Sequence, residues 1–452
     1  MTLQDQALGF SFPFRKGAPP ISTGAGRAQL FNVLLAICVG LYLFFDGSYV
    51  LQGLAMSTLI KIGVLALLFV LAWGDGGKLG RPALAVLTIY GLLSLESFVV
   101  VPFSDNIQSS FFGGVKFLGR AFITFWLLSK AFASPVTNLK LIVNLWVALA
   151  IFFAVGSLSI WILGHWLHVD LPSVTINLPR IGTSISFFLG IEAFQGEPRI
   201  QSLFSESNKF AQFLLFPLFA VLALRSTPLK WLLFAILLSA FVATFSAAVS
   251  MGVLLSAILW VVLRVRTKLL RPILLVSGLT LLAGSITYVQ QNLWENATVG
   301  PNTIYVEAWS VKQGSIEDTL DQLNLALDLA ASHPFGIGMI DREASEAFNF
   351  GSDDRNTASG FAQVLGRNGW PGILLYGLMA IIVWRTLIWY AAGVRRDEAD
   401  PRGLAAGVAF FGLMVAASNF GPYHQATLVV LLSLFLGYAH RYRTTIQSSG
   451  MG

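Results

Sequence analysis

The chain has 452 residues, of which 55% are hydrophobic and only 12% are charged. A soluble domain usually has about 25% charged residues, so this composition excludes an ordinary soluble protein and indicates a polytopic membrane protein. The net charge is +6, but no basic stripe with interleaved aromatic residues lies on a soluble segment, so nucleic-acid binding is not expected. The single cysteine, Cys38, lies in an apolar run, which excludes an intramolecular disulfide and a cysteine metal site.

About a dozen apolar runs have the length that a helix needs to cross a bilayer. Their polarity does not alternate along the chain, which disfavours a transmembrane barrel. We therefore predict an all-α polytopic membrane protein with about 12 transmembrane helices. The expected spans are residues 29–45, 50–73, 83–103, 111–133, 140–166, 208–224, 229–246, 248–263, 272–289, 370–391, 403–419 and 425–440.

The distribution of basic residues predicts the sidedness of the connections. Arg15, Lys16 and Arg27 precede the first span, so the N-terminus is expected in the cytoplasm, and no removable signal peptide is evident. Most other basic residues then fall on cytoplasmic connections. The expected organisation is a cytoplasmic tail at 1–28, helices at 29–166, an external loop at 167–207, helices at 208–289, a large external loop at 290–369, helices at 370–440 and a cytoplasmic tail at 441–452.

The two external loops are long enough to be expected to carry function. Both are expected to contain short amphipathic helices, and in the first loop "ISFFLGIEAF" has the pattern of an amphipathic segment on the bilayer surface. The second contains "SIEDTLDQLNLALDLAASHPFGIGM", which predicts an amphipathic helix capped by Ser315 and ended by Pro334 and Gly336. Its expected apolar stripe consists of Leu320, Leu323, Leu327 and Ala330.

Four ionisable residues, Lys61, Glu96, Lys116 and Arg120, lie within the predicted spans. A charge at this depth costs several kcal/mol unless it is paired or faces a hydrated cavity. Lys116 and Arg120 share one helix face at a spacing of four, and Glu96 lies at a comparable depth on the preceding helix. The sequence allows a structural ion pair between these helices or a basic wall for an anionic headgroup that enters from the outer leaflet.

The external side is rich in arginine and has no cluster of His, Cys and carboxylates that predicts a metal site. The planar guanidinium makes two parallel hydrogen bonds, which suits a diphosphate. A single external arginine is usually only solvated, but five beside two long loops favour anion binding. These five are Arg180, Arg199, Arg342, Arg355 and Arg367.

Three stretches in the same order resemble one family. "RIQSLFSESNKFAQFL" has Arg199, a short turn and then Asn208 opening a helix, and "ATFSAAVSMGVLLSAIL" stands where the family has Ser-Arg-Gly, although Ala247 here replaces the arginine. "SHPFGIGM" and "RNTASGFAQVLGRNGWPGILLYGL" resemble a Pro-x-x-Gly-x-Gly block, a His-Asn pair and a Gly-x-x-Gly helix entry. Over residues 195–385 the chain thus resembles the O-antigen ligase and O-antigen polymerase superfamily of bacterial envelope enzymes.

The resemblance implies a GT-C-like fold in the bacterial inner membrane and an active site that faces the periplasm. A polymerase would transfer a growing glycan from undecaprenyl diphosphate to a hydroxyl of a lipid-linked repeat unit, without a cofactor or metal and with inversion. Arg355 stands before Asn356 where the ligases have their proposed catalytic histidine, which favours a polymerase. A flippase and a chain-length regulator are the expected partners.

The resemblance and the chemistry together select candidate site residues. Arg199, Arg355 and Glu206 are the catalytic candidates: the two arginines for the leaving diphosphate, and Glu206 as acceptor of the hydroxyl proton. Asp353 and Asp354 compete with Glu206, which also fits an N-terminal helix cap. The binding candidates are Arg180, Arg342, Lys116, Arg120, Asn208, Asn356 and His333.

Two other functions remain open from the sequence. A ligase would move a finished glycan to lipid A-core, a surface polymer or a protein. A transporter would line its path with the intramembrane Lys61, Glu96, Lys116 and Arg120, but no internal repeat is evident. A membrane scaffold without catalytic activity would need no external arginines.

Overall fold

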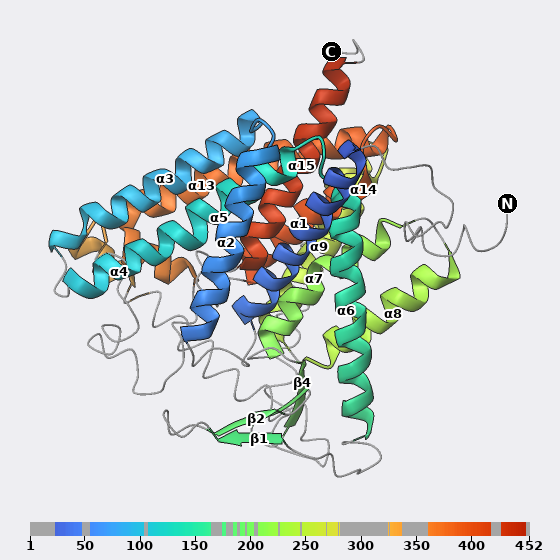
Figure 1. Cartoon of the computed structure of the whole chain (residues 1–452), viewed down its shortest axis with the longest axis horizontal. Coiled ribbons are helices and arrows are strands. Elements are labelled where there is room, and N and C mark those ends of the chain that lie inside the picture. The colour runs from blue at the N-terminus through green and yellow to red at the C-terminus, as the bar shows by residue number, and fades with distance from the viewer. Residues whose placement is uncertain are drawn as a thin grey trace.

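The computed structural model shows a helical bundle that carries two small hairpins at one end (Figure 1). Its helices share one large apolar core, and a second small core joins Ala326, Ala330 and Leu365. A helical membrane protein is thus confirmed. The structure describes residues 23–47, 55–103, 107–163, 174–177, 184–187, 190–194, 197–202, 207–224, 227–244, 246–267, 269–278, 280, 324, 326–336, 360–416 and 426–448.

The first five predicted spans overlap the helices of the N-terminal half. The fourth span is an almost straight succession of an α-helix, a π-helical turn at Leu118–Ile123 and a further α-helix. The helices are α1 (Thr23–Gly47), α2 (Ala55–Asp75), α3 (Arg81–Val99), α4 (Ile107–Phe117), α5 (Thr124–Ala133) and α6 (Leu139–Trp161), and a short 3₁₀ turn (Val101–Phe103) follows α3.

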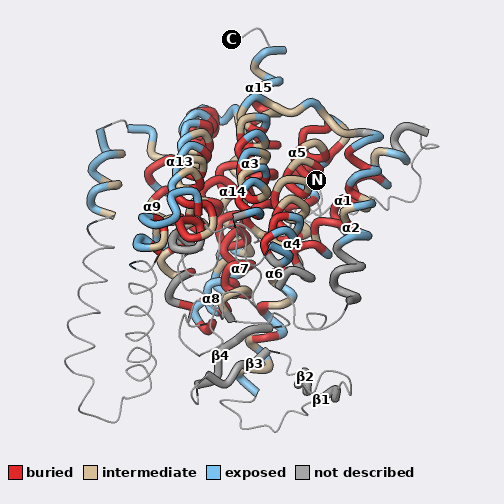
Figure 2. The backbone as a smooth tube through the Cα atoms, turned by 90° about the vertical axis from the view of Figure 1, so that its left-hand side faces the viewer, coloured by how far each residue is buried: buried red, intermediate tan, exposed pale blue. Residues whose placement is uncertain are grey.

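The C-terminal half supplies the centre of the bundle. Nearly every described side chain of α7, α14 and α15 within the bundle is buried, which is typical of helices that are apolar all round (Figure 2). Residues 270–278 are also helical. The helices are α7 (Ser207–Leu222), α8 (Pro228–Val242), α9 (Ala247–Arg264), α13 (Gly360–Arg395), α14 (Pro401–Ala416) and α15 (Ala426–Ser448).

Four described helices are long and apolar enough to cross a membrane: Gly26–Leu43, Arg81–Val99, Leu139–Trp161 and Val364–Arg395. Five shorter apolar helices accompany them: Ile62–Gly74, Asn208–Leu222, Pro228–Val242, Val249–Arg264 and Pro401–Met414. The expectation of 12 crossings and of a GT-C-like architecture therefore stays a prediction.

The first long loop corrects the expectation of amphipathic helices. Residues 185–187 and 190–194 of "ISFFLGIEAF" lie in two strands, and the described residues of the loop form two antiparallel hairpins, β1 with β2 and β3 with β4. Apolar and polar residues alternate in "VTIN" and "SISF", and this period of two favours a strand over a helix. Both β3 and β4 contact α6, and β4 also contacts α7. The strands are β1 (Val174–Asn177), β2 (Ser184–Phe187), β3 (Gly190–Phe194) and β4 (Glu197–Ser202).

The second long loop contains helical residues 326–332, as its pattern predicts, and a turn at Pro334 and Phe335 ends them. The buried face differs from the expected stripe. Ala326 and Ala330 pack on Leu365 of α13, whereas Leu327 is 39% exposed. Leu329 also reaches α13, since a Cβ at Gly366 would lie 3.6 Å from its Cδ2. Ser315, Leu320 and Leu323 lie outside the described residues.

Facing glycines bring α9 and α14 into backbone contact. A Cβ at Gly252 would lie 2.3 Å from the carbonyl oxygen of Gly412, and a Cβ at Gly412 would meet Gly252 equally closely. Ser256 strengthens the contact, because its hydroxyl donates to the carbonyl of Val408 at 3.0 Å. Small residues and interhelical hydrogen bonds of this kind drive helix association in membranes.

The predicted cytoplasmic basic residues gather at one end of the bundle, which we call the basic end. It comprises the connections 76–80, 134–138, 265–267 and 396–400 with the last turns of α15. The amide of Gly77 donates to the backbone carbonyl of Lys130, and the Arg441 side chain donates to the carbonyls of Phe132 and Ser134. Cationic side chains here satisfy carbonyls at helix ends, which need such partners.

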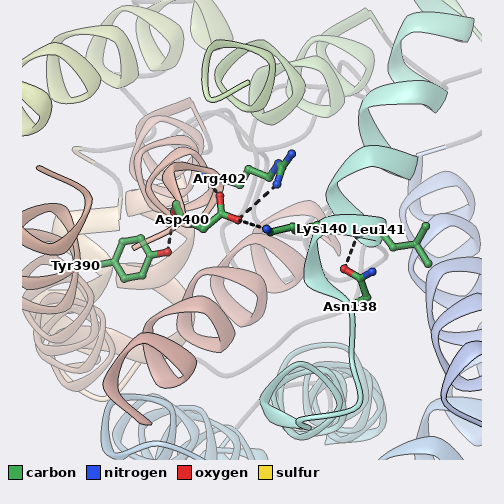
Figure 3. Close-up of polar contacts among 6 residues, drawn as sticks. All are labelled: Asn138, Lys140, Leu141, Tyr390, Asp400 and Arg402. Carbon is green, nitrogen blue, oxygen red and sulfur yellow. Dashed lines mark hydrogen bonds and ion pairs between the residues drawn. The ribbon is translucent and has the colours of Figure 1, made fainter. Parts of the chain in front are cut away.

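Asp400 organises the centre of the basic end (Figure 3). Its carboxylate accepts from the amide of Arg402 at 2.9 Å, which caps the N-terminus of α14, and also lies 4.0 Å from Lys140 Nζ. The hydroxyl of Tyr390 donates to the Asp400 carbonyl at 2.7 Å. Beside this group, Asn138 caps α6 by accepting from the amide of Leu141. The ends of α6, α13 and α14 are therefore fixed to one another.

Candidate functional site

Two loop segments meet at the start of α13, away from the basic end. The turn at residues 333–336 packs on a kink at residues 367–370, and we call this contact the turn–kink junction. Trp370 donates its amide to the carbonyl of Pro334 at 3.0 Å, and Gly336 donates to the carbonyl of His333 at 2.8 Å. Both segments belong to the sequence blocks on which the family resemblance rests.

Each segment of the junction depends on a glycine. Gly336 has φ of +76° and Gly369 has φ of +59°, a region that other residues rarely adopt. A Cβ at Gly369 would lie 2.0 Å from the carbonyl oxygen of Pro334, and one at Gly336 would lie 2.3 Å from that of Arg367. The two glycines therefore permit both the backbone conformation and the close contact. Pro371 follows the kink and opens the long apolar part of α13.

The kink directs Asn368 onto α3. Its side-chain amide donates to Oε2 of Glu96, and Asn368 itself is fully buried. Among the described atoms, Oε1 of Glu96 and Oδ1 of Asn368 are buried and have no hydrogen-bond partner. The junction thus presents two further acceptor oxygens beside the bonded pair. Buried polar atoms without a partner are uncommon, so this pair of oxygens distinguishes the junction from its apolar surroundings.

In the described part of the chain the Glu96 carboxyl bonds to Asn368, and no described contact joins it to Arg120. The other expected partner, Lys116, has a side chain outside the described residues, so a pairing with it stays a prediction. Ring contacts of Tyr90 with Phe117 at 6.5 Å and of Phe98 with Phe111 at 5.8 Å show that α3 and α4 run antiparallel. They place Glu96 opposite the part of α4 between Phe111 and Phe117, on the N-terminal side of Arg120.

The helix that bears Lys116 and Arg120 is not regular. The π-helical turn begins at Leu118, between the two residues, so the α-helical spacing that put them on one face does not hold strictly. Arg120 is half-buried, and its carbonyl accepts from the hydroxyl of Tyr42 at 3.3 Å. The side chains of Lys116 and Lys61 lie outside the described residues.

His333 opens the turn of the junction and is exposed. Its Nδ1 lies 3.0 Å from the hydroxyl of Ser332, and its amide donates to the carbonyl of Leu329 at 2.7 Å. The backbone is therefore held at the end of helical residues 326–332 while the ring remains accessible. Arg367, at the start of the kink, is half-buried.

The opening stretch of the resemblance runs from β4 into α7. The backbone of Arg199 is paired with Glu192 in the β3–β4 ladder, and α7 begins at Ser207. Asn208 is half-buried in the first turn of α7, where the helix dipole favours anions. The side chain of Arg199 lies outside the described residues. So do residues Arg180, Glu206, Arg342, Arg355 and Asn356.

The comparison with known protein families covers the residues of the turn–kink junction. Residues 232–377 match the family model described as O-antigen ligase. Over these residues the chain is similar to the O-antigen ligase family. This confirms the resemblance to the O-antigen ligase and O-antigen polymerase superfamily. A search of curated proteins finds no match to the chain.

The matched region begins within α8 and ends within α13, so it contains both segments of the turn–kink junction. It also contains Arg342, Arg355 and Asn356, whereas Glu96, Arg199 and Asn208 lie before it. The match supports a membrane enzyme for glycan transfer, of the ligase or polymerase type, and gives no support to a transporter.

Sequence reasoning missed Asn368 and the pairing of the two glycines. The signal for the glycines was present, because Gly369 stands two residues before Pro371 and Gly336 two residues after Pro334. Asn368 had no comparable signal, since its partner is 272 residues away in the chain. Among the described residues no group of three or more His, Cys, Asp or Glu side chains could hold a metal ion.

Proposed function

We propose that the chain is a polysaccharide polymerase of the O-antigen ligase and polymerase superfamily. The acceptor hydroxyl of a lipid-linked repeat unit attacks the anomeric carbon of a growing glycan on undecaprenyl diphosphate. The new glycosidic bond forms as the bond to the diphosphate oxygen breaks, with inversion. The hydroxyl proton passes to a carboxylate, and undecaprenyl diphosphate leaves.

The observation that carries this proposal is the turn–kink junction inside the matched region. Glu96 lies three residues before the end of α3, and the opposite end of α3 begins at the basic end. Asn368 lies near the start of α13, whose last residue, Arg395, donates to the carbonyl of Leu263 at the basic end. The junction, with the exposed His333, therefore occupies the pole of the bundle that faces away from the basic end.

We assign the anionic leaving group to Arg199 and Arg355. The diphosphate gains charge in the transition state, so positioned guanidinium groups lower the barrier selectively and replace a divalent metal. Arg180 and Arg342 are further diphosphate ligands, and Lys116 and Arg120 form the basic wall for the lipid headgroup. Glu206 accepts the proton of the attacking hydroxyl. Asn208, Asn356 and His333 are further ligands of the substrate or its diphosphate.

The ligase is the alternative within the family. The matched family is described as O-antigen ligase, and His333 is exposed beside the junction, where a histidine base would have access to an acceptor. Arg355 in place of the proposed ligase histidine favours the polymerase. On either assignment the reacting groups face the periplasm of a bacterial inner membrane.

Cells that produce the polysaccharide with this chain as its only polymerase provide the test. Arg199→Ala and Arg355→Ala should remove long polymer and accumulate single lipid-linked repeat units, with the protein still abundant. Arg266→Ala is the matched control, because Arg266 is exposed at the basic end and pairs with Asp397 at 3.0 Å.

Unchanged polymer length and amount in both variants would reject the assignment. Long polymer that is no longer attached to its acceptor would instead identify a ligase. Repeat units that stay on the cytoplasmic face would identify a transport function.

A further inference from the structure

A cavity of about 340 Å³ opens at the basic end between α3, α13 and α15, far from the turn–kink junction. Residues from all three helices line it, so it is a product of the tertiary fold. Cationic side chains, one aromatic ring and a helix N-terminus contribute to its wall. The lining includes Gly80, Pro82, Arg385, Trp389, His440 and Arg443.

The charge of the lining is one-sided. Arg385 and Arg443 contribute positive charges, and no carboxylate lines the cavity. In the part of the chain that the structure describes, Arg385 and Arg443 form no ion pair. Their neighbours at the same end do, as Arg396 with Glu398 at 3.1 Å shows. The acidic residues of the basic end thus neutralise other cations and leave this cavity positive.

The backbone adds to the anion preference. α3 begins at the cavity wall, and its N-cap, Gly80, makes no side-chain cap hydrogen bond. Pro82 has no N–H, and the remaining amides of this helix N-terminus favour negative charge. Gly80 also keeps the cavity open, because a side chain at this position would place its Cβ 3.0 Å from Nδ1 of His440.

The outer border of the cavity is apolar and faces the surroundings of the bundle. Ile381 and Ile388 of α13 are 57% and 44% exposed on either side of the exposed Arg385. Trp389 is partly exposed, and its ring lies 5.0 Å from that of Tyr442, as expected for an aromatic residue at a membrane interface. A positive cavity beside an apolar, membrane-facing surface fits a molecule with both a phosphate and acyl chains.

We propose that this cavity binds the phosphate headgroup of an anionic phospholipid from the leaflet at the basic end. Arg385 and Arg443 bind the phosphate oxygens, and the acyl chains run from there away from the basic end, along the exposed residues Ile381, Leu378 and Leu374 of α13. Basic pockets between transmembrane helices bind anionic headgroups in this way. The proposal concerns α3, α13 and α15 at the basic end and does not depend on the proposed glycan transfer.

Native mass spectrometry of the full-length protein tests the proposal, with phosphatidylglycerol and phosphatidylcholine as probes. The wild type should retain phosphatidylglycerol at least about tenfold more tightly than phosphatidylcholine. The variant with both Arg385→Gln and Arg443→Gln should lose this preference. Arg266→Gln, which removes one charge elsewhere at the basic end, should keep it.

A second variant separates loss of binding from loss of folding. Arg385→Lys keeps the positive charge and should retain most of the preference for phosphatidylglycerol. Phosphatidylglycerol should also raise the melting temperature of this variant and of the wild type. It should not raise that of the double variant. Equal retention of phosphatidylglycerol by the double variant and the wild type would overturn the proposal. Displacement of the lipid by millimolar inorganic phosphate would also overturn it and identify a site for a free anion.

Discussion

Replacement of Asn368 by leucine should lower the free energy of unfolding by about 1–3 kcal/mol, the usual cost of leaving a buried polar group without its partner. Asn368 is fully buried and donates to Oε2 of Glu96, whose other oxygen already has no partner among the described atoms. Leucine has a similar volume but no donor. The variant therefore leaves the Glu96 carboxyl buried without its described hydrogen bond.

A double-mutant cycle isolates this contact. Glu96→Leu should cost a similar amount, because it leaves the amide of Asn368 unpaired, and the double variant should cost clearly less than the sum of the two. We expect a coupling free energy of about 1–2 kcal/mol, within the range for groups in direct contact.

The assay is unfolding of the purified protein by sodium dodecyl sulfate in mixed micelles, followed by tryptophan fluorescence. Ser97→Ala is the matched control on α3, because this buried hydroxyl donates only to the carbonyl of Leu93 in its own helix. It should change the unfolding free energy by less than about 1 kcal/mol. Strict additivity of Glu96→Leu and Asn368→Leu would refute the energetic role of the junction.

Three further variants test the packing. Gly369→Ala should markedly reduce the yield of folded protein or its melting temperature, because φ of residue 369 is +59° and the new methyl would lie 2.0 Å from the carbonyl oxygen of Pro334. Gly377→Ala is the control and should be tolerated, because its methyl meets nothing within 4 Å. Gly412→Ala should separate α9 from α14 and lower the melting temperature, and Gly156→Ala, with open space around it, should not; equal effects would contradict the close contact. Asn138→Ala removes the cap of α6 and should cost about 0.5–2 kcal/mol in the unfolding assay; no change would show that the cap is dispensable.

Part of the candidate site could be predicted from the sequence alone. The turn after Ser332 follows from Pro334 and Gly336, because proline and glycine do not continue a helix. The start of α7 beside Asn208 follows from the change from polar to apolar residues. The role of Arg199 and Arg355 stays a prediction, since it depends on how their side chains approach a substrate.

The sequence determined that this protein is a helical membrane protein, because runs of apolar residues are stable in lipid only when their backbone hydrogen bonds are made within the helix. It also determined which connections carry the basic residues that gather at the basic end. Only the tertiary structure decided that Glu96 pairs with Asn368, that "ISFFLGIEAF" forms strands and that Leu327 is exposed while Ala326 is buried. Each of these depends on which distant backbone comes within a few ångströms, and local residue preference does not specify that.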